Sequence, residues 1–169
     1  MENAAKEPIN PYGQTKLQDE HLFEKYSKLG VKIIGLRYFN IFGQGQTLEY
    51  AGVITKFLER IREGKPPIIY GDGSQIRDFI YVEDVVMANF LAMTSNGSNL
   101  LVNVGSGKAI TILELANIIL EISGLNFKPI FEDSLEGDIK KSHADMELVT
   151  KTFNWKPEKE LRDWLKEVI

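Results

Sequence analysis

The sequence contains no cysteine, and this absence excludes disulfide bonds, thiol nucleophiles and metal sites built on cysteine. Only two histidines are present, His21 and His143, and they lie too far apart to form a histidine-based metal motif. A single histidine is most often a surface or packing residue. The sequence therefore predicts no metal site.

Long hydrophobic runs are also lacking. The apolar runs extend over a few residues, whereas a membrane-spanning helix needs about 20, and residues 1–8 lack the apolar stretch of a secretory signal. An excess of positive charge is absent too, since 20 lysines and arginines stand against 24 aspartates and glutamates. We therefore expect a cytoplasmic protein whose partners include neither nucleic acid nor a membrane.

Helical and strand-like patterns alternate along the 169 residues, which suffice for one domain with a real core. Asn10 and Pro11 are typical of a helix start and Gly30 of its end, while Thr111 with Glu114 forms a capping box. Helices are expected over residues 11–29, 54–63, 83–92 and 112–123, in a short stretch from 145, and over 161–168. Strands are expected over residues 31–36, 68–70, 79–82, 100–104 and 128–131. This alternation indicates an α/β fold with a largely parallel sheet.

Tyr12 and Lys16 form the first candidate catalytic pair. Four residues apart on a helix, they lie on one face and can reach the same ligand. A phenol is a poor base at neutral pH, but a neighbouring ammonium favours its phenolate. Such a pair can take a proton from a hydroxyl that is being oxidised. By itself the spacing is common on solvated helices.

Several motifs occur in one order along the chain. They read N-P-Y-G-Q-T-K-L-Q-D-E at 10–20, R-Y-F-N-I-F-G at 37–43, G-D-G-S-Q-I-R-D-F-I-Y-V-E-D-V at 71–85 and N-V-G-S-G at 103–107, followed by Gly137-Asp138 and Ala144-Asp145. From about residue 8 to the end, the sequence resembles the extended short-chain dehydrogenases. Within that family it is most similar to the nucleotide-sugar epimerases and dehydratases, and among these to the UDP-glucose 4-epimerase group.

The resemblance implies the C-terminal part of a Rossmann-like NAD(P)-binding fold plus a small α/β substrate lobe. Residues 1–50 would be the tail of the Rossmann-type domain, and residues 51–169 mainly the nucleotide-sugar lobe, with 78–104 returning to the Rossmann sheet. The family's G-x-G-x-x-G phosphate motif is absent, because every G-x-G in this sequence lacks the third glycine. We therefore expect that the half that grips NAD, together with a catalytic serine or threonine upstream of Tyr12, is missing.

The resemblance also assigns roles to individual residues. Tyr12 matches the catalytic base, Lys16 the residue that binds the nicotinamide ribose, and Tyr38 a contact to the cofactor near the nicotinamide. The substrate-binding set comprises Asn40 and Arg77 for the diphosphate, Val53, Ile68 and Tyr70 for the uracil ring, and Asp138.

Some of these assignments have alternatives. Arg77 could instead form a salt bridge with Asp78 or Asp84, and we expect Asp78, Tyr81 and Asp84 to fix the loop rather than to touch substrate. Related epimerases carry a second arginine at the position of Leu135. Lys140 or Lys141 could supply the charge there, as point charges rather than as planar forks.

The function implied is that of a UDP-sugar 4-epimerase, in which hydride leaves the sugar C4 for NAD and returns to the opposite face of a 4-keto sugar. Within the family the alternative is a nucleotide-sugar dehydratase or decarboxylase, and outside enzymes it is a non-catalytic nucleotide-sugar-binding remnant. This chain alone is expected to be inactive and to retain no NAD. Its unpaired sheet edge at residues 31–36 predicts self-association, a homodimer or pairing with the missing half.

Overall fold

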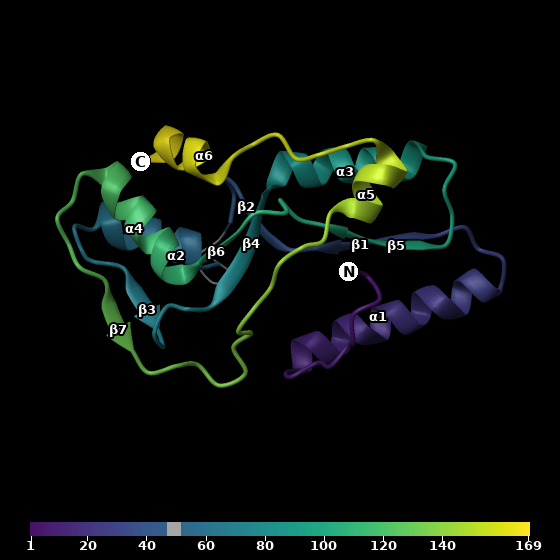
Figure 1. The fold of residues 1–169 in the computed structure, drawn as a ribbon, viewed down its shortest axis with the longest axis horizontal. Coiled ribbons are helices and arrows are strands. Elements are labelled where there is room, and N and C mark those ends of the chain that lie inside the picture. Colours follow the sequence, from purple (N-terminus) through teal and green to yellow (C-terminus); the bar gives the residue numbers. More distant parts are fainter. Residues whose placement is uncertain (47–51) are drawn as a thin grey trace.

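The computed structural model describes residues 1–46 and 52–169, in which helices and strands alternate (Figure 1). In chain order the elements are α1 (Pro11–Lys28), β1 (Ile34–Tyr38), β2 (Asn40–Phe42), α2 (Val53–Arg62), β3 (Ile68–Tyr70), β4 (Ile76–Tyr81), α3 (Val82–Thr94), β5 (Leu100–Val104), β6 (Ala109–Thr111), α4 (Ile112–Ser123), β7 (Ile130–Glu132), α5 (Glu147–Phe153) and α6 (Leu161–Val168). The predicted α/β class is confirmed.

Each helix and strand expected from the sequence is present, with some boundaries displaced. β1 begins at Ile34 rather than at Val31, because the amide of Val31 still donates to the carbonyl of Tyr26 and closes the end of α1. β4 begins earlier than expected, and Val82 belongs to α3. β2 and β6, of three residues each, were not predicted from the sequence.

The strands form three small sheets. β1 pairs with β5, β2 with β4, and β3 with β7, each in parallel, whereas β4 pairs with β6 in antiparallel orientation. The expectation of a largely parallel arrangement therefore holds. β5 joins β1 although the whole of the segment from β2 to α3 lies between them in the sequence.

Two hydrophobic cores meet at β4. Phe79 belongs to a core with Phe57 of α2 and Leu115 of α4, and Ile80 belongs to a second core beneath α3 and α5. Successive side chains of a strand point to opposite faces, so neighbouring residues serve different cores. β4 is thus the element that fixes the two parts relative to each other, as its central position in Figure 1 illustrates.

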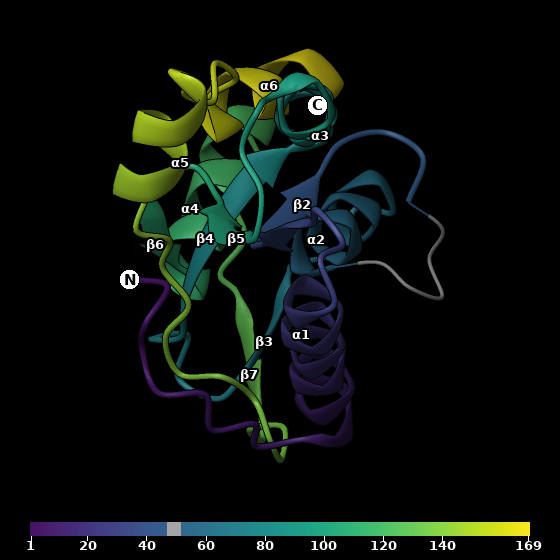
Figure 2. The same cartoon turned by 90° about the vertical axis from the view of Figure 1, so that its right-hand side faces the viewer.

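Helix α1 lies along the outside of the molecule (Figure 2) and has no buried residue. Its main tie to β1 is polar. Arg37 donates to both carboxylate oxygens of Glu20, through Nε at 2.6 Å and Nη2 at 2.8 Å, and Lys6 approaches Glu20 to 2.7 Å. At its start, Asn10 caps the helix by accepting the amide of Gly13 at 2.8 Å. Polar contacts therefore set the position of the helix that carries Tyr12 and Lys16.

The division expected near residue 50 falls within residues 47–51, outside those described, so the partition into a Rossmann tail and a substrate lobe stays a prediction. No helix in the described ranges combines the length and the hydropathy needed to cross a membrane.

Candidate functional site

The largest set of predicted site residues converges on one cavity of about 450 Å³ between α2, β3 and β4. Its lining includes all the residues that the sequence assigned to substrate binding, which are Asn40, Val53, Ile68, Tyr70, Arg77 and Asp138. These residues come from separate elements spread over the chain, and no short sequence window contains them. The cavity is therefore the candidate nucleotide-binding pocket.

Strand β3 supplies one wall because its side chains alternate. Ile69 is fully buried in the core, whereas Ile68 and Tyr70 point to the opposite face and line the cavity. The half-exposed ring of Tyr70 and the side chains of Ile68 and Val53 give this wall an apolar surface on which a flat ring can pack.

Arg77 lies at the polar end of the cavity, with its side chain 12% exposed. One terminal nitrogen, Nη2, donates to Oδ1 of Asp138 at 2.6 Å, and the other, Nη1, donates to the carbonyl of Ile76 at 2.9 Å. The salt bridges to Asp78 or Asp84 considered from the sequence do not form. Arg77 is instead oriented by Asp138, another member of the predicted site.

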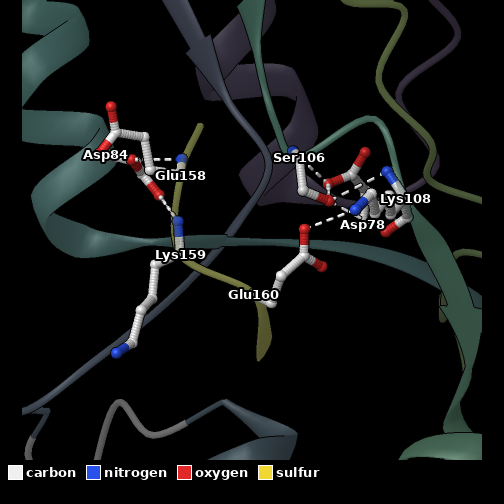
Figure 3. Close-up of polar contacts among 7 residues, drawn as sticks. All are labelled: Asp78, Asp84, Ser106, Lys108, Glu158, Lys159 and Glu160. Carbon is white, nitrogen blue, oxygen red and sulfur yellow. Dashed lines mark hydrogen bonds and ion pairs between the residues drawn. The ribbon is translucent and has the colours of Figure 1, made fainter. Parts of the chain in front are cut away.

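Two buried aspartates, Asp78 and Asp84, hold loops in place by accepting hydrogen bonds (Figure 3). Asp78 is fully buried and accepts hydrogen bonds from backbone amides and one hydroxyl, namely the amide and Oγ of Ser106 at 2.7 Å each, the amide of Gly107 at 3.0 Å and the amide of Ala144 at 3.1 Å. Asp84 accepts the amides of Glu158 and Lys159 at 2.9 and 3.2 Å. Both carboxylates thus fix loops, as the sequence predicted for them.

Sequence reasoning missed several residues of the cavity. Lys56 and Arg60 line it from α2, and Gln75 lines it from the turn before β4. The α2 residues could have been found, because Lys56 and Arg60 stand one and two helical turns beyond Val53 on the same face. Leu135, noted from the sequence as replacing an arginine, also lines the cavity and is 55% exposed.

Charges of both signs surround the cavity. Lys56, Arg60 and Arg77 bring positive charge to the lining, and Glu59, Glu63 and Asp138 bring negative charge. Arg60 donates through Nε to the carbonyl of Pro66 at 2.5 Å, which holds its guanidinium near the end of α2. The hydrogen bond from Lys65 holds the pKa of Glu63 below its usual value. An anionic ligand in the cavity could therefore accept charge-assisted hydrogen bonds from Arg77 and Lys56.

Tyr12 and Lys16 lie outside the cavity, on the exposed first turns of α1. The Nζ atom of Lys16 is 5.7 Å from the centre of the Tyr12 ring, and Tyr12 is 72% exposed. Lys16 also donates to Oδ2 of Asp19 at 2.8 Å, and this hydrogen bond raises the pKa of Lys16 above its ordinary value. Lys16 therefore remains a cation beside the phenol over the neutral pH range.

Tyr38 occupies a different surface from the substrate set. Its hydroxyl donates to Oδ1 of Asn89 on α3 at 2.8 Å, and its ring lines a shallow cavity between β1 and α3. A role for Tyr38 in contacting a cofactor stays a prediction.

The residues described fit one end of a dinucleotide only. Tyr12 and Lys16 present adjacent hydroxyl and ammonium groups to solvent, which suits the hydroxyls of a ribose. The sequence has no G-x-G-x-x-G turn to receive the pyrophosphate. Within residues 1–46 and 52–169, no three histidine, aspartate or glutamate side chains gather into a group that could hold a metal ion.

Residues 1–105 match the model of the NAD dependent epimerase/dehydratase family. Among curated proteins, the chain is 36% identical over 170 residues to a Methanocaldococcus jannaschii protein provisionally named UDP-glucose 4-epimerase. That alignment covers 99% of this chain and 55% of the relative. The chain spans about half the length of the curated relatives it matches.

Solved structures also match this chain over about half of their own length. UDP-glucose 4-epimerase from Thermotoga maritima, in a structure with UDP-glucose, superposes with a TM-score of 0.89 at 35% identity, covering 98% of this chain and 57% of the other. UDP-glucuronic acid 4-epimerase from Bacillus cereus, in complex with UDP-glucuronic acid and NAD, gives a TM-score of 0.90 at 30% identity, covering 98% and 53%.

Proposed function

Because the chain belongs to the NAD-dependent epimerase/dehydratase family, we propose that it forms the nucleotide-sugar-binding portion of a UDP-sugar 4-epimerase. The observation that carries this proposal is the convergence of Asn40, Arg77 and Asp138 with an apolar wall in one cavity. Two of the relatives above are 4-epimerases whose structures contain UDP-glucose or UDP-glucuronic acid, which supports a UDP-sugar as the ligand.

In the proposed binding mode, the pyrimidine ring packs on Val53, Ile68 and Tyr70, and the diphosphate meets Arg77. The planar guanidinium of Arg77 can donate two parallel hydrogen bonds to phosphate oxygens. Asp138 holds that guanidinium in place before the ligand arrives, since it already accepts from Nη2. Orientation before binding lowers the entropy lost on binding.

In the proposed reaction, Tyr12 accepts the proton of the sugar 4-hydroxyl and later returns it. Lys16, a cation beside the phenol ring, stabilises the phenolate that this step requires. NAD, when bound, supplies the hydride acceptance and hydride return that inversion at C4 needs. The residues of this chain hold the nucleotide, orient the sugar and move the proton.

We further propose that the chain by itself neither retains NAD nor epimerises UDP-glucose. It offers Tyr12 and Lys16 to the nicotinamide end, and it lacks the glycine-rich turn that places a pyrophosphate at a helix N-terminus. Assembly with a dinucleotide-binding segment would complete the site. NAD present in stoichiometric amount after purification, or measurable turnover, would contradict this part of the proposal.

The binding proposal is tested by titrating UDP and uridine into the chain and following binding by calorimetry or by NMR chemical shifts. Arg77→Ala should weaken UDP about tenfold or more, because each lost bond to a charged group is worth about 1.5–3 kcal/mol. Uridine binding should be unchanged, since uridine has no diphosphate. Arg62→Ala is the matched control, because Arg62 is exposed and does not line the cavity. Equal UDP binding by Arg77→Ala and the unaltered chain would remove Arg77 from the site.

A further inference from the structure

The loop that carries Asp138 lies against the start of α1, as both ribbon views show (Figures 1 and 2). The amide of Asp138 donates to the carbonyl of Leu135 at 3.3 Å, and Gly137 between them has φ +74°. A positive φ at the third position of a turn is the mark of type II, where glycine is favoured. This turn, residues 135–138, supplies Leu135 and Asp138 to the cavity.

One side chain spans the space between this turn and α1. The Nδ2 atom of Asn10 donates to the carbonyl of Gly137 at 3.3 Å, while its Oδ1 accepts the amide of Gly13 at 2.8 Å. A Cβ atom placed on Gly137 would lie 3.7 Å from the Cβ of Asn10, so the two backbones are in near contact. Asn10 therefore uses one end of its amide to cap the helix and the other end to hold the turn.

The connection extends from the cavity to the catalytic pair. Asp138 binds Arg77 at 2.6 Å, Gly137 precedes Asp138, and Asn10 caps the helix whose first two turns carry Tyr12 and Lys16. The segment that follows the turn is bonded to β4. The amide of Ile76 donates to the carbonyl of Lys140, and the amide of Ser142 donates to the carbonyl of Ile76, each at 2.9 Å. Because α1 has no buried residue, few other contacts fix its first turn.

We propose that Asn10 is a positioning residue that couples the nucleotide pocket to the first turn of the Tyr12 helix. A ligand that engages Arg77 and Asp138 steadies the 135–138 turn, and Asn10 transmits this order to the helix by its hydrogen bond to Gly137. Coupling of this kind requires a contiguous set of contacts, which these residues provide. The inference rests on the proposed function for the identity of the ligand, and on the hydrogen bonds alone for the link itself.

The side chain of Asn10 allows its two contacts to be separated by substitution. Asn10→Asp keeps an oxygen that can cap the helix and loses the donor to Gly137, so it breaks the link selectively. Asn10→Ala removes both contacts. A residue that acts only as a helix cap would tolerate aspartate, which is itself a preferred cap, and would be impaired only by alanine.

The first experiment needs no ligand. Amide hydrogen exchange of residues 136–139 should be about fivefold faster in Asn10→Asp than in the unaltered chain, as expected for the loss of one ordinary hydrogen bond. The first turn of α1 should keep its protection in Asn10→Asp and lose it in Asn10→Ala. Unchanged exchange at residues 136–139 in Asn10→Asp would overturn the proposal.

The second experiment adds UDP and records NMR signals of the Tyr12 ring and of the amides of residues 12–16. In the unaltered chain these signals should shift on saturation with UDP, and in Asn10→Asp the shifts should disappear while UDP affinity stays within about twofold of the original. Shifts of equal size in both proteins, or none in the unaltered chain despite binding, would refute the coupling. Failure of UDP to bind the unaltered chain would count against the proposed function, and the ligand-free experiment would still decide the link.

Discussion

The buried side chain of Asp78 makes more hydrogen bonds than the side chain of any residue assigned to the substrate site. Its carboxylate is fully shielded from solvent and accepts hydrogen bonds from the β5–β6 loop and from the amide of Ala144. Asp78 directly follows Arg77 in β4. A Cβ on Gly105 would lie 3.1 Å from both carboxylate oxygens and 2.5 Å from the Cβ of Ala144, so glycine is required for this close approach.

We predict that Asp78→Asn lowers the free energy of unfolding by about 3 kcal/mol, because the amide nitrogen would face backbone donors in a buried site. Asp72→Asn is the matched control, since Asp72 is exposed and accepts only from nearby Ser74, and its effect should stay within about 0.5 kcal/mol. Urea unfolding followed by circular dichroism measures both. Equal effects of the two substitutions would contradict the role given to Asp78.

By the sequence resemblance, Leu135 is the cavity residue that stands where related epimerases are expected to carry an arginine. It lines the cavity and is more than half exposed, so a longer polar side chain can be accommodated there without burying a charge. We predict that Leu135→Arg strengthens UDP binding about tenfold, through one added charge-assisted hydrogen bond to the diphosphate. Titration of UDP and uridine into the variant checks this, and an equal gain for uridine would show that the diphosphate is not involved.

The local role of a single residue could be predicted from the sequence, but its contact partners could be predicted only where they lie close by in the chain. Motifs pointed to Arg77 and Asp138 separately, but their 2.6 Å contact joins positions 61 residues apart and could not be read from either motif. Likewise Asn10 was expected to cap a helix, and it does, while its bond to Gly137 follows only from the three-dimensional path of the loop. Local chemistry was predictable, and long-range partners were not.

Among the elements, α1 is held to the rest of the molecule by ionic contacts. The guanidinium of Arg37, with Lys6 beside it, holds the pKa of Glu20 below its ordinary value, and both Glu20 and Arg37 are partly buried, with side chains 18% and 22% exposed. A carboxylate whose pKa is lower in the folded than in the unfolded state, where it is about 4.3, stabilises the fold above that pH. This contribution is lost as the pH falls through the folded pKa.

We therefore predict that α1 loses hydrogen-exchange protection as the pH is lowered from about 5 toward 3, before the cores around β4 do. Glu20→Gln should show reduced protection of α1 already at neutral pH and little further change on acidification. Glu24→Gln, at an exposed position of the same helix, should behave as the unaltered chain. Simultaneous loss of protection in α1 and in the cores would argue against a separate ionic tie.

Helices and strands could be predicted where the sequence shows a repeating apolar pattern or a capping residue. Helix α4 shows this, since its capping box of Thr111 and Glu114 and its end at Gly124 are both found in the structure. The antiparallel pairing of β4 with β6 was not predictable, because it is decided by the packing of distant segments.

At the scale of the whole molecule, an apolar stripe remains exposed on α3. Val86, Phe90 and Met93 follow one face of the helix and are 62%, 58% and 83% exposed. The edge of β1 opposite β5 lies nearby and pairs with no other strand of the described part of the chain. Exposed apolar patches and open strand edges favour association with another chain.

We predict that the chain self-associates and that Phe90→Asp combined with Met93→Asp shifts it toward the monomer. Ile169→Asp is the control, since Ile169 is an exposed apolar residue that lies apart from this stripe in the sequence. Light scattering or sedimentation velocity over a wide range of concentrations measures the change. A monomer at every concentration for the unaltered chain would rule out the prediction.

The pairing of β1 with β5 also has a consequence for the time order of synthesis. Ile34 is made 66 residues before its partner Leu100, and at ordinary rates of translation this delay lasts roughly 3–13 s. For that time the nascent β1 cannot form its pairing with β5, and parallel pairing across such a separation is slow even once both strands exist. A chaperone that binds extended apolar segments would find its best opportunity on the ribosome, in the interval between the emergence of β1 and that of β5.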